Sequence, residues 1–407
     1  MTELAAGGIE RAADSKSSAD RFPCFDGFRA AAALSVLVFH VAATSRSSLR
    51  TDGPGPYLAR LDVGVAVFFV ISGFLLYRPF VAAHLEARPG PAVAQFFKRR
   101  FLRILPAYWL ATTAVVYVFR SWAGGVITDV KSFVLYYSLL HSYNFDTIFA
   151  PLLQAWTLAT ELAFYLFLPV WALAMRKLAA GAAPARRLRI ELIALTALFG
   201  LSFAYRAVVL VYAPDDRAGQ FLMWLPAWLD LFAAGMALAA IRTWIVQRGG
   251  AAPFGLGHAA APATCWALAA LAFWAVSTRI GIDPSVPGFT TAQDIGAHEL
   301  YGLTAFFFLL PGIFGPQDAG LIRRLLRSRV AQSIGLVSYG IYLWHENWIS
   351  EYLEWRNLRV FSAPFWPMLG AVLGLTVVAA AVSYLLVERP ALRLKHHRLF
   401  RIAADDR

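Results

Sequence analysis

The sequence predicts an all-α, polytopic bundle of about ten transmembrane helices. Apolar residues make up 59% of its 407 residues and charged residues only 15%, whereas soluble domains carry about a quarter charged residues. The apolar residues form continuous runs of about 20, long enough for a helix to cross a ~30 Å hydrocarbon core. Lys and Arg gather between alternate runs, a pattern that orients membrane helices. The composition therefore excludes an ordinary soluble, disordered or disulfide-stabilised protein.

The N-terminal residues 1–24 are polar, with charges of both signs, and we expect a disordered cytoplasmic tail. The following apolar run ends in small residues, as a signal peptide does, but Arg29 and His40 interrupt it. A signal peptide would be cleaved off, whereas the orientation expected for the later helices requires this segment as the first transmembrane helix. We therefore expect one transmembrane domain over residues 25–390, followed by a basic cytoplasmic tail, 391–407.

Ten apolar runs are long enough to span the membrane. They cover residues 25–44, 62–81, 101–119, 152–175, 190–212, 220–241, 262–279, 296–315, 333–352 and 365–387. An eleventh apolar segment, near 133–143, is short and has polar flanks. We expect this segment to form a short re-entrant or surface helix.

The loop charges predict the orientation of these helices. With a cytoplasmic N-terminus, ten crossings place 26 Lys and Arg residues on the inner side and nine on the outer side. This split follows the positive-inside rule, whereas an extra crossing at 133–143 would move the basic loop 176–189 outside. We therefore expect a multi-pass protein of the inner (plasma) membrane with both termini cytoplasmic. We attribute its net charge of +12 to the basic cytoplasmic loops of a protein whose partner is the lipid bilayer. We expect no nucleic acid partner.

Several ionisable side chains lie inside the predicted helices, where they are costly and mark functional or paired sites. A rise of about 1.5 Å per residue places His40, Glu161 and His345 at similar depth, in the middle-to-outer half of the membrane. A histidine oriented by a carboxylate is a typical general base. The alternative is that each group satisfies a polar neighbour. Arg206 and Asp230 lie on adjacent antiparallel helices, and we expect a structural ion pair between them.

Four basic residues, Lys98, Arg99, Arg100 and Arg103, gather at the inner end of the third run. Arg100 and Arg103 are three residues apart and share a helix face, so their guanidinium groups could clamp phosphates. The alternative is an ordinary positive-inside anchor. No glycine-rich phosphate loop accompanies them, and no His/Cys cluster has zinc spacing. No metal and no permanently bound cofactor are therefore expected.

Six motifs occur in order between about residues 22 and 395. They are FDGFRAAAALSVLVFH with Arg29 and His40, GVAVFFVISGFLLYRPF with Ser72, RRFLRILPAYW with Arg100 and Arg103, AWTLATELAFYLFLP with Trp156 and Glu161, SYGIYLWHENW with Tyr339 and His345, and VERPALRL with Glu388 and Pro390. This ordered set resembles the integral-membrane acyltransferase-3 family, which acylates sugars and glycolipids of bacterial envelopes.

The resemblance implies an O-acyltransferase that uses acyl-CoA as co-substrate, with acetyl as the favoured acyl group. The acceptor would be a hydroxyl of an envelope glycolipid, a polysaccharide or another carbohydrate. The residues implied in donor binding are Arg99, Arg100 and Arg103. Those implied in catalysis are His40 as general base, Glu161 as its orienting partner and Arg29. Those implied in substrate binding are His345, Tyr339, Trp156 and Ser72.

Two departures from the family pattern matter. Many members carry Asp where this chain has Ala66, so that position receives no role. Some members have a fused extracytoplasmic domain, whereas this chain ends at Arg407, so we expect it to acylate its acceptor directly or through a separate partner. A proton-coupled transporter or flippase of a lipid-linked substrate is the alternative function, and dependence on acyl-CoA distinguishes the two.

Overall fold

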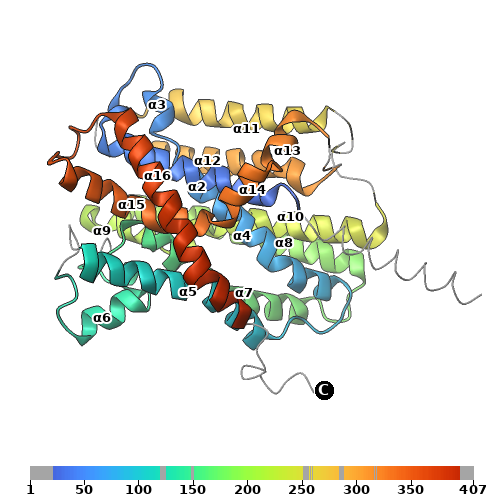
Figure 1. Cartoon of the computed structure of the whole chain (residues 1–407). Coiled ribbons are helices and arrows are strands. Elements are labelled where there is room, and N and C mark those ends of the chain that lie inside the picture. Colours follow the sequence, from blue (N-terminus) through green and yellow to red (C-terminus); the bar gives the residue numbers. More distant parts are fainter. Residues whose placement is uncertain are drawn as a thin grey trace, which may run out of the picture.

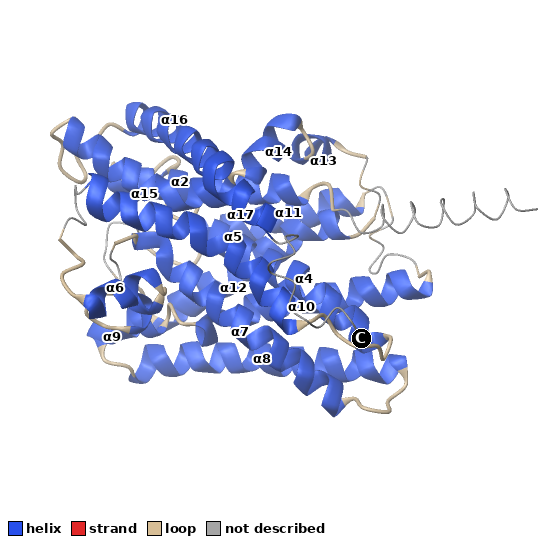
Figure 2. Ribbon diagram, turned by 60° about the horizontal axis from the view of Figure 1, so that its bottom comes forward, coloured by secondary structure: helices blue, strands red, loops and turns tan. Residues whose placement is uncertain are grey.

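The structure is a computed structural model that describes residues 22–119, 125–147, 151–250, 256, 258, 260–283, 288–315, 317 and 319–394. Within these residues the secondary structure is entirely helical (Figures 1 and 2). The tails predicted for 1–24 and 391–407 lie largely outside the described residues. The predicted all-α bundle is confirmed for the described part of the chain.

Each of the ten predicted spans overlaps a long helix, but two have displaced bounds: the long helix at 220–241 is Leu229–Arg248, and the one at 333–352 is Ser338–Trp355. The helices are α2 (Phe25–Thr44), α3 (Gly55–Leu58), α4 (Val63–Leu85), α5 (Val93–Thr113), α6 (Val130–Tyr137), α7 (Trp156–Leu178), α8 (Pro184–Tyr212), α9 (Asp215–Phe221), α10 (Leu229–Arg248), α11 (Ala261–Thr278), α12 (Thr291–Ile313), α13 (Leu321–Leu326), α14 (Arg329–Leu336), α15 (Ser338–Trp355), α16 (Phe365–Ser383) and α17 (Arg389–Arg393). Helix α5 continues into a π-helical segment, Ala114–Phe119, and α16 into another, Tyr384–Glu388.

Eight helical segments of the described residues are long and apolar enough to cross a membrane. They are Phe25–Thr44, Gly55–Leu85, Val93–Phe119, Leu153–Leu178, Pro184–Tyr212, Leu225–Arg248, Ala261–Thr278 and Phe365–Arg393. The predicted spans 296–315 and 333–352, which correspond to α12 and α15, are not among these eight. Both helices carry acidic and histidine side chains, which lower their mean hydropathy, and both are packed into the bundle against apolar helices.

Helix α4 is the centre of the bundle. It packs against α10 most extensively, and also against α2, α7 and α12. Glycines make the α4–α10 contact close: a Cβ at Gly73 would lie 2.2 Å from the carbonyl oxygen of Phe232, and one at Gly235 would lie 2.2 Å from that of Val70. Small residues at such crossings let helix backbones approach and gain dispersion contacts in a membrane. Any side chain at these two glycines would force α4 and α10 apart.

The helices α2 and α15 lie side by side, although about 300 residues separate them in the sequence. Helix α15 packs against both α2 and α16, and Figure 2 shows α16 at one edge of the bundle and α8 at the opposite edge. Gly340 makes the α15–α16 contact possible, because a Cβ there would lie 2.8 Å from the side chain of Ala380. This packing brings the motif of the first helix against the motif near residue 345.

The predicted ion pair between Arg206 and Asp230 is wrong. Arg206 instead forms an ion pair with Asp294 of α12, with 2.7 Å between Nη1 and Oδ1, and donates a hydrogen bond to the carbonyl oxygen of Ala227. Asp230 contacts His298 of α12, with 2.5 Å between Oδ2 and Nε2. Helix α12 packs against both α8 and α10. Its polar residues therefore pair with Arg206 and Asp230, which we had expected to pair with each other.

The eleventh apolar segment forms the short helix α6 and a following 3₁₀ turn, Leu140–Tyr143. Asp129 caps α6 by accepting a hydrogen bond from the backbone amide of Ser132 at 2.7 Å, and this amide and the Ser132 hydroxyl lower the pKa of Asp129. Tyr108 and Trp109 of α5 donate hydrogen bonds to the carbonyl oxygens at the end of α6. The segment is therefore a short helix fastened to the side of α5, as the sequence predicted.

Candidate active site

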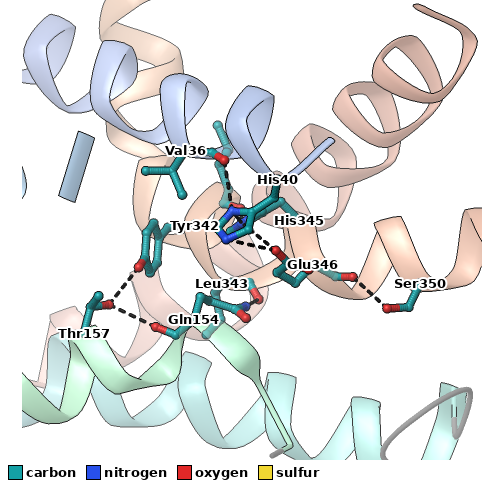
Figure 3. A network of polar contacts seen from close by, with 10 residues as sticks. Val36, His40, Gln154, Thr157, Tyr342, Leu343, His345, Glu346 and Ser350 are labelled. Atoms are coloured by element: carbon teal, nitrogen blue, oxygen red, sulfur yellow. Dashed lines mark hydrogen bonds and ion pairs between the residues drawn. The ribbon is translucent and has the colours of Figure 1, made fainter. Parts of the chain in front are cut away.

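Three ionisable side chains meet where α2 contacts α15 (Figure 3). The Nε2 atom of His345 lies 3.1 Å from Nδ1 of His40. The Nε2 atom of His40 lies 3.2 Å from Oε1 of Glu346. His345 and Glu346 are buried, whereas the His40 side chain is 22% exposed. The structure thus brings together His40 and His345, which the sequence placed at one depth, and adds a carboxylate.

The backbone carbonyl oxygens favour hydrogen on one nitrogen of each ring. Nδ1 of His40 lies 3.0 Å from the carbonyl oxygen of Val36, and Nδ1 of His345 lies 3.2 Å from that of Ile341. A carbonyl oxygen can only accept, so these two contacts are hydrogen bonds in the tautomers that carry hydrogen on Nδ1. In the neutral state, Nε2 of His345 then accepts from His40, and Nε2 of His40 is unprotonated. A proton taken up at this last atom would face the carboxylate of Glu346, which stabilises the resulting imidazolium.

His40 also forms part of the wall of a cavity, here called the histidine cavity, of about 150 Å³. The other polar and aromatic residues around it are Phe39, Asp62, Gln154, Trp156, Trp228, Tyr301 and Tyr342. Tyr301 donates a hydrogen bond of 2.5 Å to Asp62, and the Oε1 atom of Gln154 is buried without a hydrogen-bond partner among the described residues. The cavity therefore offers a general base, a carboxylate and an unused acceptor atom to a polar ligand.

A second cavity, here called the arginine cavity, encloses about 110 Å³ between α2, α4, α5, α7 and α15. The charged residues that line it are Arg29, Arg100, Arg103 and Glu161. Arg29 also forms an ion pair with Asp26 at 3.2 Å, and Glu161 accepts a hydrogen bond of 2.8 Å from Ser72. Three guanidinium groups against one lining carboxylate favour an anionic or carbonyl-bearing ligand.

The two cavities share part of their walls. Val65 and Tyr342 line both of them, and the Tyr342 hydroxyl lies 2.8 Å from Oγ1 of Thr157, which lines the arginine cavity. Figure 3 shows Tyr342 between Thr157 and the histidine cluster. A ligand in one cavity therefore contacts two side chains that also line the other cavity.

The structure places Glu161 away from the position expected for it. Its carboxylate lies in the arginine cavity with Ser72, whereas the carboxylate that contacts His40 is Glu346 of α15. The reason is the rotation of α7, which turns this residue toward α4. The membrane depth estimated from the sequence gives the position of a residue along the helix axis, but not the direction of its side chain around that axis.

The other predicted site residues divide between the two cavities. Tyr339 lines the arginine cavity and donates a hydrogen bond of 2.9 Å to the carbonyl oxygen of Ile104. Trp156 lines the histidine cavity, 5.4 Å from the ring of Trp228. Arg99 is exposed and donates to Gln95. Arg99 therefore points away from Arg100 and Arg103, as adjacent residues on a helix do.

Glu346 of the cluster and several residues that line the histidine cavity, among them Asp62, Gln154 and Tyr301, were not predicted from the sequence. Glu346 follows His345 directly, which could have marked it as a candidate. Asp62 precedes Ala66 by one helical turn and lines the same cavity. It therefore supplies a carboxylate close to the position where many members of the resembled family carry Asp. No feature of the sequence marked Tyr301 as a site residue, because nothing in the sequence indicates its contact with Asp62.

The histidine cluster has ligand atoms close enough for a metal ion, since one atom each of His40, His345 and Glu346 lies within 4.8 Å of the others. Two histidines and one carboxylate are a known zinc ligand set. A metal would, however, have to replace the direct contacts between the two rings and between His40 and Glu346. The geometry therefore favours a proton-transfer cluster.

Comparisons with known proteins identify the family of the chain. The family model described as "Acyltransferase domain" matches residues 22–388. The exopolysaccharide production protein ExoZ of Rhizobium meliloti is 28% identical over 81% of this chain and 89% of its own length. The acyltransferase MdmB of Streptomyces mycarofaciens is 26% identical over 93% of both chains. The putative peptidoglycan O-acetyltransferase YrhL of Bacillus subtilis is 26% identical over 90% of this chain and 54% of YrhL.

No solved structure gives a significant match to the chain. The family match nevertheless covers most of the sequence, including both cavities and the histidine cluster. It also agrees with the eight apolar helices of the bundle. The chain therefore belongs to the acyltransferase-3 family of integral-membrane acyltransferases.

Proposed function

We propose that the chain transfers an acyl group, with acetyl the first candidate, from acyl-CoA to a hydroxyl of a cell-envelope carbohydrate or glycolipid. The names of its relatives support this substrate class, since ExoZ is an exopolysaccharide production protein and YrhL a putative peptidoglycan O-acetyltransferase. The observation that carries the proposal is the position of His40. It forms part of the wall of one cavity, and that cavity shares the wall residues Tyr342 and Val65 with a second, arginine-lined one.

The orientation of the bundle decides from which side each substrate enters. The ends of α4 and α10 and the start of α8 carry many arginines, and we assign this basic end to the cytoplasm by the positive-inside rule. Acyl-CoA then enters the arginine cavity from the cytoplasm. The acceptor enters the histidine cavity from the opposite side of the membrane.

Labelling of a cysteine in the loop between α7 and α8 tests this orientation. The native Cys24 and Cys265 are buried, so Ala182→Cys in intact cells gives a readable signal. We expect no reaction with a membrane-impermeant reagent until the cells are permeabilised. Reaction from outside would reverse the assignment.

We infer the binding site of the acyl donor from the positive charge of the arginine cavity. Arg100 and Arg103 line the arginine cavity from the same face of α5, and Arg29 lines it from α2. Guanidinium groups bind phosphate oxygens bidentately and also polarise carbonyl oxygens. The cavity is too small for a nucleotide but accommodates the acyl-thioester end of the donor. Ser72 and Glu161 form its polar floor through their mutual hydrogen bond.

We infer the binding site of the acceptor from the residues that line the histidine cavity. Trp156 and Trp228 present two aromatic rings, and apolar faces of sugar rings pack well on such surfaces. Asp62 and Gln154 can hydrogen-bond hydroxyl groups, since Oε1 of Gln154 has no other partner among the described residues. A site of few polar groups on aromatic walls is typical of small-ligand pockets.

The chemical step follows from the tautomers of the cluster. Nε2 of His40 accepts the proton of the acceptor hydroxyl, while the oxygen forms a bond to the thioester carbonyl carbon. The bond from this carbon to sulfur then breaks, and the CoA thiolate takes the proton back from His40. Glu346 stabilises the imidazolium between these events, and His345 holds the ring by accepting from its Nδ1.

Acyl transfer by the purified protein in lipid vesicles tests the proposal. Acetyl-CoA would be added with oligosaccharides of exopolysaccharide or peptidoglycan, and release of CoA thiol compared with the acetyl content of the sugar by mass spectrometry. We expect the two to rise together and to require His40. Movement of the sugar across the membrane without acetyl-CoA, and no acetylated product, would instead support a transporter.

A further inference from the structure

A second basic feature lies at the same end of the bundle, where α4 ends, α8 begins and α10 ends. It is a groove of about 1240 Å³, here called the arginine groove. Five arginines line it: Arg78, Arg88, Arg187, Arg242 and Arg248. One acidic residue, Glu86, also lines it and is engaged by Arg88 and by Gln247. The groove is therefore strongly positive and suited to a ligand with more than one phosphate.

Contacts between the three helix ends hold the groove in shape. Nη1 of Arg187 donates to the carbonyl oxygens of His84 and Leu85, at 3.3 and 3.4 Å. Nε2 of Gln247 donates to Oε1 of Glu86 at 2.8 Å. These bonds join α8 and α10 to the end of α4. A preformed site loses less entropy on binding than one that must assemble around its ligand.

The groove adjoins the arginine cavity. Leu75 lines both, and along α4 the arginine cavity is lined by Ser72 and Leu76, and the groove by Arg78 and Pro79. The two spaces differ about tenfold in volume, at 110 Å³ and 1240 Å³. A ligand with a narrow chain and a bulky, charged head would fit only with its chain in the cavity and its head in the groove.

We propose that the arginine groove binds the 3′-phosphoadenosine head of acyl-CoA, while its acyl-pantetheine chain passes Leu75 into the arginine cavity. This inference rests on the proposed function, because it assumes acyl-CoA as the donor. The groove arginines bind the 3′-phosphate, and Arg100 and Arg103 remain for the diphosphate at the mouth of the cavity. The guanidinium of Arg248 lies 4.0 Å above the ring of the half-buried Trp244, and in the proposed complex it turns to the 3′-phosphate and leaves this aromatic face to the adenine.

An anionic phospholipid headgroup shares the phosphate chemistry of this ligand. A lipid, however, lacks the planar base that Trp244 would stack on, and its phosphate would have no reason to adjoin the arginine cavity. The nucleotide explains both the aromatic ring and the shared Leu75. The experiment below distinguishes acyl-CoA from an anionic phospholipid as the ligand of the groove.

The test compares acetyl-CoA with 3′-dephospho-acetyl-CoA as donors for the full-length protein in lipid vesicles. Arg248→Ala removes an exposed guanidinium from the groove, and Arg186→Ala is a matched control, since Arg186 is exposed on α8 next to a groove residue and does not line the groove. We expect Arg248→Ala to raise the KM for acetyl-CoA about tenfold with kcat unchanged. The KM for the dephospho donor should change little, and Arg248→Lys should restore part of the loss.

Equal changes of KM for both donors, or none for either, would overturn the inference while leaving the proposed function intact. A wild-type protein with no acetyl-CoA-dependent transfer would instead overturn the proposed function. Binding of adenosine 3′,5′-bisphosphate, measured calorimetrically, gives a readout without turnover. We expect it to weaken in Arg248→Ala and not in Arg186→Ala. Competition by phosphatidylglycerol, combined with no binding of the nucleotide, would identify the groove as a lipid site and overturn the inference.

Discussion

Two of the buried histidine–carboxylate pairs among the described residues differ in what surrounds them. His40 contacts Glu346 at 3.2 Å and forms the wall of the histidine cavity. His298 contacts Asp230 at 2.5 Å and is enclosed, with Trp228 packed against its ring at 5.1 Å and Ser202 donating to the same carboxylate. The first pair is open to a ligand, whereas the second joins α10 to α12.

The difference teaches that a buried histidine beside a carboxylate is not by itself a catalytic unit. A general base must reach the proton it removes, so a cavity next to its free nitrogen decides its role. In the enclosed pair, Ser202 and His298 each contact one oxygen of Asp230, and such a pair fixes the positions of two helices. The following variants test this contrast, in order of decreasing expected effect.

His40→Ala should give the largest loss of activity. General-base assistance contributes about 10²–10⁴-fold, so turnover should fall by that factor while donor binding persists. His40→Gln should not restore activity, because an amide cannot take up the proton. The measurement is the rate of acetyl transfer by protein whose folding is verified by size-exclusion chromatography. Turnover near that of the wild type would remove His40 as the base and make His345 the candidate.

His298→Ala should act on stability instead. It leaves the buried Asp230 carboxylate without its histidine partner, and breaking such a pair costs about 3–5 kcal/mol. The midpoint of thermal unfolding in detergent should therefore fall clearly, while the protein that remains folded keeps its kcat. A loss of kcat with unchanged unfolding would mean that this pair takes part in the reaction and that the contrast is wrong.

Glu346→Gln should have an intermediate kinetic effect. Hydrogen bonds to charged groups contribute about 1.5–3 kcal/mol, so loss of the negative charge beside His40 should lower kcat about 10- to 100-fold. The KM for both substrates should stay the same, and the effect should not add to that of His40→Ala. Glu161→Gln is the informative comparison: if it reduces kcat and Glu346→Gln does not, the carboxylate partner inferred from the geometry is wrong.

Arg103→Ala should give the smallest of these effects, on donor binding alone. Loss of one guanidinium–phosphate contact should raise the KM for acyl-CoA about tenfold, and Arg103→Lys should recover only part, since Lys lacks the bidentate fork. Arg99→Ala is the control, because Arg99 is exposed and lies outside the arginine cavity. Equal KM values for the three variants and the wild type would reduce the cluster to a membrane anchor.

Much of the fold follows from the sequence because the bilayer restricts the choices. A segment such as 25–44 is apolar over 20 residues, and in a membrane such a segment must satisfy its backbone hydrogen bonds within one helix. The helix α2 has the predicted bounds for that reason. The short helix α6 was also predictable, since its polar flanks and the loop charges opposed a crossing.

Partners between helices were harder to predict. Arg206 and Asp230 were expected to pair with each other, but each pairs with a residue of α12, because a buried charge takes the nearest partner from any neighbouring helix. Glu161 was placed at a suitable depth, yet its direction around α7 brings it to Ser72. Nothing in the linear spacing of residues reports the rotation of one helix relative to another.

The sequence by itself determined the membrane class, the helices and the candidate residues His40 and His345, because apolar runs and intramembrane charges carry strong transfer energies. Only the tertiary structure decided that Glu346 is the carboxylate beside His40 and that Tyr342 lines two cavities. The physical reason is that hydropathy acts on each segment separately. Side-chain partners and cavities depend on how the segments pack, and close contacts such as Gly73 against Phe232 set that packing.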